Sequence, residues 1–125
     1  MRLHAAEEQD LRKRTKAFAL RIIRLYAALP KQSAVQILGR QVLRSGTSVG
    51  AHIAEANFAK SRADFINKLE GALQELEETR YWLELLLEGE FVKPARLKPL
   101  TEETGELIAI LVTIVSRSRR STSKD

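Results

Sequence analysis

The chain has 125 residues, a formal net charge of +5 and a sequence pI of about 9.8. This length suits one domain, residues 1–125, with a hydrophobic core of its own. The absence of cysteine excludes disulfides, thiolate metal sites and a thiol nucleophile, and it fits a cytoplasmic protein. Neither a signal segment nor an apolar run long enough to cross a membrane is evident.

The first helix is expected over residues 10–28. Its apolar residues recur at three- and four-residue spacing from Leu11 onward, which places them on one face. Pro30 ends the helix, because the residue before a proline is displaced from the α region. The opposite face carries basic side chains around an apolar pair, Leu20 and Ile23. Apolar residues on an outer face favour contact with a second molecule.

The second helix is expected over residues 33–57, and its middle, QVLRSGTSVGAHIAEA, is rich in small residues. A glycine inside a helix costs about 1 kcal/mol relative to alanine. Gly46 and Gly50 therefore indicate that another helix passes close to this backbone. Together with Ser45 they are predicted to form the closest helix crossing of the fold. Gly71, expected inside the next helix, is predicted to face Gly46 there.

The third helix is expected over residues 62–88. Ser61 and Asp64 have the spacing of a capping box at its start. Gly89 is expected to end it by adopting a left-handed conformation.

The fourth helix is expected over residues 95–118. Its apolar residues cover more than half of the circumference, which is more than one packed face needs and indicates a subunit contact. Residues 119–125 are predicted to form a basic, disordered tail. The residues predicted to form an oligomer interface are Leu20, Ile23, Ile108 and Val112.

Long helical patterns joined by brief linkers, without the alternation of a strand, predict an all-α fold. Short linkers join antiparallel neighbours. The expected architecture is therefore an up-down-up-down antiparallel four-helix bundle.

Charge is divided unevenly along the chain. Residues 11–54 contain nine basic residues and no acid, whereas residues 70–90 contain seven acids and one base. The two regions can be solvated faces that attract each other, or the basic region can face an anionic partner, and the pattern is compatible with both. Arg44, Glu55 and Glu75 are predicted to form an ion-pair network that sets helix register.

The sequence GTSVG at residues 46–50 matches a pattern typical of serine hydrolases. That pattern needs a strand, a turn and a helix, whereas both flanks here are helical. The Glu-x-x-His motif of di-metal bundles does not occur. No catalytic residue, metal ligand or cofactor is therefore predicted, and His52 is interpreted as a hydrogen-bonded structural residue. A helix-turn-helix over residues 36–69 is disfavoured because its helices would be too long.

The central run resembles a known family. With Ser61, Asp64, Phe65 and the GALQELE stretch at residues 71–77, it is similar to the four-helix bundle proteins encoded in intervening sequences of bacterial 23S ribosomal RNA genes, also called S23 ribosomal proteins. His52 and Ala56 stand where the family usually has asparagine and glycine, and Ala72 departs from a usual Gly-Ser. The positions that match the central family pattern are Gln41, Arg44, Ser45, Ser48, Gly50, Ile53, Ala54 and Glu55.

The resemblance implies a homo-oligomer, with a pentameric ring as the expected form, and no enzyme activity. A related group, the accessory variability proteins of diversity-generating retroelements, implies a basic bundle ring that binds a reverse transcriptase and nucleic acid. Neither a membrane nor a small-molecule substrate is implied.

The leading hypothesis is a non-enzymatic homo-oligomer that binds RNA or a ribonucleoprotein by backbone electrostatics. The alternative is an oligomeric protein-protein scaffold with no role in nucleic-acid binding. The predicted phosphate contacts are Arg12, Lys13, Lys16, Arg24 and Arg40.

Overall fold

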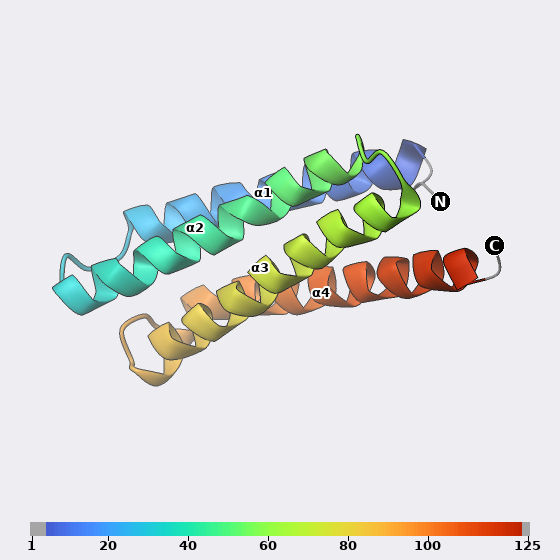
Figure 1. Cartoon of the computed structure of the whole chain (residues 1–125). Coiled ribbons are helices and arrows are strands. Elements are labelled where there is room, and N and C mark those ends of the chain that lie inside the picture. The colour runs from blue at the N-terminus through green and yellow to red at the C-terminus, as the bar shows by residue number, and fades with distance from the viewer. Residues whose placement is uncertain (1–4, 124–125) are drawn as a thin grey trace.

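Four α-helices make up the described part of the chain. The structure, a computed structural model, describes residues 5–123, and within this range no strand is present. The helices run alternately in opposite directions, so that the start of α1 and the end of α4 lie at the same end of the molecule (Figure 1). The expected all-α antiparallel bundle is confirmed. The helices are α1 (Ala5–Ala27), α2 (Ser33–Ala56), α3 (Arg62–Glu88) and α4 (Pro94–Ser123).

The C-terminal segment differs from its prediction. Helix α4 continues to Ser123, so the expected disordered tail is wrong for residues 119–123, whereas residues 124–125 lie outside the described residues. Tertiary contacts explain the extension: Ser118 is buried, and Arg119 forms an ion pair with Glu70 of α3. A polar, basic composition does not prevent a helix from continuing when a neighbouring helix supplies partners.

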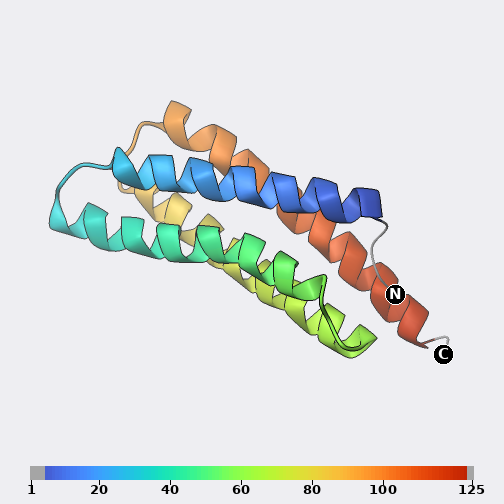
Figure 2. The same cartoon turned by 90° about the horizontal axis from the view of Figure 1, so that it is seen from above.

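The helices pack as neighbours in chain order. The pairs α1–α2, α2–α3 and α3–α4 are in contact along much of their length, whereas α1 and α4 approach each other over a short stretch only. Viewed from above, α4 crosses α1 instead of running alongside it (Figure 2). The bundle is therefore more open between its first and last helices than between the others.

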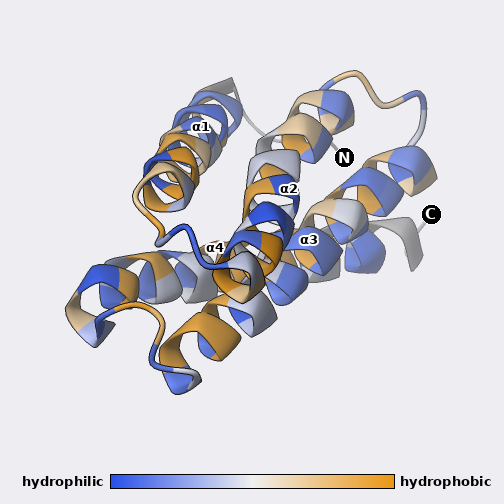
Figure 3. Cartoon of the chain, turned by 90° about the vertical axis from the view of Figure 1, so that its left-hand side faces the viewer, coloured by the Kyte–Doolittle hydropathy of each residue, from blue (hydrophilic) through white to orange (hydrophobic). Residues whose placement is uncertain are grey.

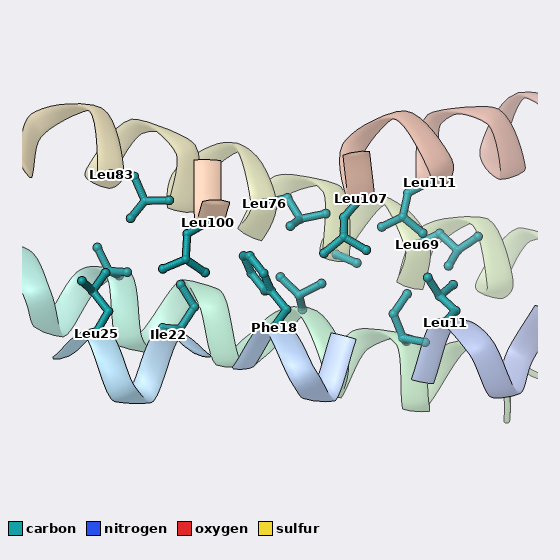
Figure 4. Close-up of a cluster of buried hydrophobic side chains, with 14 of the residues drawn as sticks. Leu11, Phe18, Ile22, Leu25, Leu69, Leu76, Leu83, Leu100, Leu107 and Leu111 are labelled. Atoms are coloured by element: carbon teal, nitrogen blue, oxygen red, sulfur yellow. The ribbon is translucent and has the colours of Figure 1, made fainter. Parts of the chain in front are cut away.

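Leucine, isoleucine and phenylalanine side chains fill the core. Each helix has a hydrophobic and a hydrophilic side (Figure 3), as the three- and four-residue spacing predicts. Figure 4 shows how the buried residues of three helices meet: Leu11, Phe18, Ile22 and Leu25 from α1, Leu69, Leu76 and Leu83 from α3, and Leu100, Leu107 and Leu111 from α4.

The glycines of α2 lie against α1. A Cβ at Gly46 would stand 2.8 Å from Cγ1 of Ile22, and one at Gly50 would stand 3.5 Å from Oγ1 of Thr15. Gly39, which the sequence analysis did not single out, packs in the same way against Leu29. The three glycines therefore form one α2 surface that admits side chains of α1 and of the turn that follows it.

Gly71 does not face Gly46, so that prediction is wrong. A Cβ at Gly71 would stand 2.8 Å from Cε1 of His52, on the α2–α3 side of the bundle. The glycines of α2 face α1. The position of a glycine along α2 does not by itself show whether that glycine faces α1 or α3. His52 fills the space above Gly71. Its Nδ1 atom lies 4.0 Å from a carboxylate oxygen of Glu55 and makes no hydrogen bond among the described residues.

Ser45 also belongs to the α2–α3 contact. Its hydroxyl lies 2.7 Å from that of Thr79, and both side chains are buried. Each hydroxyl also lies within hydrogen-bond distance of a carbonyl oxygen one turn earlier in its own helix. The predicted crossing residues thus divide between two contacts, with Ser45 and Gly71 on the α3 side and Gly46 and Gly50 on the α1 side.

The predicted cap at the start of α3 agrees with the structure, whereas the predicted cap at its end does not. The predicted cap at its start is confirmed, because the Ser61 hydroxyl accepts a hydrogen bond from the Asp64 amide at 3.1 Å. At the other end Gly89 has a right-handed φ of −76°, whereas Glu90 has the left-handed φ of 59°. The amides of Glu90 and Phe91 donate to the carbonyls of Leu87 and Leu86, which is a Schellman motif shifted by one residue from the predicted position.

Candidate nucleic-acid interface

The five predicted phosphate contacts are all exposed. Among the described side chains, no ion pair joins any of them to a carboxylate. Their positive charge is therefore available to a partner. These residues are Arg12, Lys13, Lys16, Arg24 and Arg40.

The structure brings three of the five together. Arg12, Lys13 and Lys16, with Gln9, line a shallow hollow of about 230 Å³ on the outer side of α1. Arg24 follows Lys16 by eight residues, which corresponds to roughly 12 Å along a helix axis. Arg40 lies on α2 and does not line this hollow. The predicted set is one cluster with two separate cations.

A second basic hollow was not predicted. It has a volume of about 270 Å³ and lies between α1 and the first turns of α4. The place of Arg21 on the flank of α1 could have been predicted from the helical period. The contribution of Arg96 could not, because Arg96 belongs to a segment distant in sequence. The residues that line this hollow are Arg21, Arg24, Leu25, Arg96, Pro99 and Leu100.

Two other cations of the acid-free region are neutralised. Arg14 donates two hydrogen bonds of 2.8 Å to the carboxylate of Glu103 and lies 3.3 Å from Glu106. The hydrogen bond to Glu103 raises the pKa of Arg14. Arg14 therefore holds α1 to α4 instead of contributing to a free basic surface.

Arg44 makes the corresponding contact between α2 and α3. Its guanidinium lies 2.5 Å from Glu78 and 3.4 Å from Glu75, and the hydrogen bond to Glu78 raises its pKa. Glu55, predicted to share this network, instead lies 3.4 Å from Lys68. Eleven residues separate Arg44 from Glu55, roughly 16 Å along a helix, so one network could not include both.

The predicted oligomer residues are not equivalent. Leu20, Ile23 and Val112 are 45%, 44% and 48% exposed, whereas Ile108 is partly buried and packs against the core. Leu20 and Ile23 lie on the outer side of α1, between the clustered cations and Arg24. The outer side of α1 therefore changes from basic near Gln9 to mixed apolar and basic beyond Lys16.

Other exposed apolar residues were not predicted. The most exposed is Phe58, at 83%, in the α2–α3 turn. The other large apolar residues that are exposed and were not predicted to be so are Ile37, Tyr81 and Leu87.

Gly105 on α4 faces open space. No atom lies within 4 Å of a Cβ placed on it, in contrast to the other glycines inside helices.

Two further properties concern the described residues alone. Within them, no three histidine, aspartate or glutamate side chains are grouped so that they could hold a metal ion. None of the four helices, over its described length, is long and apolar enough to cross a membrane.

Comparisons with known proteins agree on one family. Residues 7–113 match the family model described as 23S rRNA-intervening sequence protein. Among solved structures, a protein of unknown function from the S23 ribosomal protein family of Bacteroides thetaiotaomicron is 40% identical, with a TM-score of 0.81. The match covers 87% of this chain and 97% of that protein. No curated protein matches.

Proposed function

This chain belongs to the 23S rRNA-intervening sequence protein family, and we propose that it is a non-enzymatic, homo-oligomeric protein that binds RNA or a ribonucleoprotein through the outer side of α1. One observation carries the proposal. Arg12, Lys13 and Lys16 are exposed, lie together and have no carboxylate partner among the described residues, although the chain contains acids enough to neutralise them.

The chemistry favours the phosphate backbone over base reading. Lysine and arginine that neutralise phosphates release condensed counterions, and the resulting affinity depends on charge and not on sequence. Sequence-specific RNA recognition usually stacks bases on exposed aromatic rings. The described part of the α1 surface presents no such ring, since Phe18 is buried and Tyr26 packs against the core. Arg24, farther along α1, and Arg40, on α2, are separate exposed cations that can contact other phosphates of the same strand.

Salt dependence tests this proposal. The affinity for a labelled single-stranded RNA, measured by fluorescence anisotropy, should fall with salt along a log-log slope of about −0.7 per phosphate contact. Charge reversal of Lys13→Glu and Lys16→Glu should remove most of the affinity. Lys31→Glu with Lys60→Glu, which reverses two exposed lysines outside α1, is the matched control and should retain more. An affinity that does not change with salt contradicts the proposal.

The scaffold alternative has its own support. Leu20 and Ile23 interrupt the basic side of α1, and exposed apolar residues of this size favour a protein partner. The same charge reversal separates the two functions: capture of a protein partner would survive it, whereas binding to RNA would not.

Self-association is the second part of the proposal. It is supported by the exposed Leu20, Ile23 and Val112 and by the resemblance, which favours a pentamer. The two parts of α1 can serve different partners, because the clustered cations end at Lys16 and the exposed apolar pair begins at Leu20. A subunit contact at the apolar part leaves the cationic part free.

A further inference from the structure

The hollow between α1 and α4 gathers positive charge without a counter-charge. Arg21 and Arg24 come from α1 and Arg96 from α4, and the other lining residues are Leu25, Pro99 and Leu100. None of the six is acidic. Among the described side chains, no ion pair joins these three arginines to a carboxylate.

Two carboxylates that follow the hollow along α4 are paired with another arginine. Glu103 and Glu106, which follow on α4, lie against Arg14, which precedes Arg21 on α1 by seven residues, or about two turns. Like charges placed around one hollow repel each other, and a hollow between two helices screens them less well than open water does. An arrangement of this kind is stabilised when an anion enters.

We propose that this hollow binds a terminal phosphate monoester of an RNA strand, an inference that rests on the proposed RNA-binding function. A phosphate monoester carries a charge of about −1.5 to −2 at pH 7. An internal phosphodiester carries a single charge, so three guanidinium groups match the terminal group better. Arginine also presents paired N–H donors that fit phosphate oxygens.

The size and the apolar floor of the hollow fit the same ligand. At about 270 Å³ it is smaller than most ligand pockets, which measure roughly 300–1,000 Å³, and this size suits a phosphate with part of its sugar. Leu25 and Leu100 are buried and form one side of it, next to Pro99. Pro99, with the edges of Leu25 and Leu100 that line the hollow, can pack against the ribose while the arginines hold the phosphate.

The hollow continues the proposed RNA path. Arg24 lies roughly 12 Å beyond Lys16 along α1. Arg21, Ala17 and Lys13 follow one another at four-residue spacing along one flank of α1. A strand whose terminal phosphate is held at Arg21, Arg24 and Arg96 can therefore run along this flank, beside Leu20 and Ile23, toward Lys13. The hollow would anchor the end of the strand, and the cluster would bind its internal phosphates.

The experiment compares RNAs that differ only in their end groups. The full chain is titrated with one short RNA carrying a 5′-phosphate, a 3′-phosphate or hydroxyls at both ends. We expect one phosphorylated form to bind about tenfold more tightly than the hydroxyl form, a difference of about 1.4 kcal/mol. Arg21→Gln and Arg96→Gln should abolish this preference. Lys98→Gln, which removes an exposed charge from the same part of α4, should retain it.

Each outcome bears on a different claim. Equal, salt-dependent affinity for all three RNAs overturns the terminal-phosphate inference and leaves the proposed function standing. Failure to bind any RNA overturns both. Loss of the preference in Lys98→Gln as well overturns the assignment to this hollow. Competition by adenosine monophosphate would support the phosphate monoester and show that a free nucleotide suffices. Circular dichroism verifies that each variant is folded.

Discussion

At the scale of single residues, the surroundings of a helical glycine decide what a methyl group would do there. Gly46 and Gly105 both lie inside helices, and both lose helix propensity relative to alanine. Gly46 is buried against Ile22, whereas nothing lies near a Cβ at Gly105. The same substitution should therefore have opposite effects at the two positions.

Gly46→Ala should lower the free energy of unfolding. The added Cβ would meet Cγ1 of the fully buried Ile22 at 2.8 Å. Overpacking of this kind costs about 1–3 kcal/mol, and alanine regains about 1 kcal/mol of helix propensity, so we expect a net loss of up to about 2 kcal/mol by urea denaturation. In a double-mutant cycle, Ile22→Ala should relieve part of this cost; strict additivity would contradict the packing explanation.

Gly105→Ala should raise the free energy of unfolding by about 1 kcal/mol, because only the gain in helix propensity remains. The same denaturation measurement checks it at a protein concentration low enough to favour monomers. If a neighbouring subunit packs against Gly105, the variant should also associate less strongly, which a concentration series would reveal.

Glu90→Gly should stabilise the α3–α4 turn. Glu90 is exposed and holds a φ of 59°, a conformation that costs an L-residue about 1–2 kcal/mol. Glycine removes this strain and adds about 0.5–1 kcal/mol of entropy to the unfolded chain. We expect a net gain of up to about 1.5 kcal/mol by thermal or urea denaturation. A loss of stability would indicate that the Glu90 side chain makes a contact worth more than the strain.

At the scale of the helices, a bidentate polar contact joins α1 to α4. They approach over a short stretch, and the two hydrogen bonds from Arg14 to Glu103 join them there. A bidentate arginine–carboxylate pair is stronger and more directional than a single contact. Arg14 is about a third exposed, however, which limits its contribution to stability.

Glu103→Gln should lower the free energy of unfolding by about 1–2 kcal/mol, since it removes a charge-assisted pair. Glu102→Gln, at an exposed neighbour, is the matched control and should change stability by less than about 0.5 kcal/mol. Equal effects in the two variants would show that the pair does not hold α4 to α1.

The raised pKa of Arg14 sets the pH range of this contribution. A basic group whose pKa is higher in the folded state stabilises the fold fully below its unfolded pKa and loses the effect only as the pH rises through its folded pKa. The unfolded value for arginine is already above about 12. The difference between wild type and Glu103→Gln should therefore stay constant from neutral pH to about pH 10, measured by urea denaturation at each pH.

At the scale of the whole molecule, the proposed assembly can be tested separately from RNA binding. Light scattering at tens of micromolar protein should give a mass of several chains. Replacing Leu20 and Ile23 with aspartate should lower it, because both residues are nearly half exposed and a charge there opposes burial. Ile37→Asp, at an exposed isoleucine of α2, is the control. A monomeric wild type would refute self-association.

The sequence by itself determines the helices, their buried faces, the separation of basic and acidic segments and the family. These features depend on residues that are close along the chain or on the helical period of 3.6 residues. The spacing of apolar residues such as Leu11 and Phe18 shows that period directly. The start of α3 at Ser61 is also determined locally, because the capping hydrogen bond joins Ser61 to Asp64, three residues later.

Tertiary structure alone decides which of these residues meet. It turns Gly46 toward Ile22 instead of Gly71, and it neutralises Arg14 with a glutamate 89 positions away. Arg12 and Lys13, in contrast, have no carboxylate partner among the residues that the structure describes. Tertiary structure also brings Arg96 to Arg21 around one hollow. The physical reason is that the helical period specifies the faces of one helix but not the rotation and register of the helix beside it. Those are set by packing and charge pairing between helices.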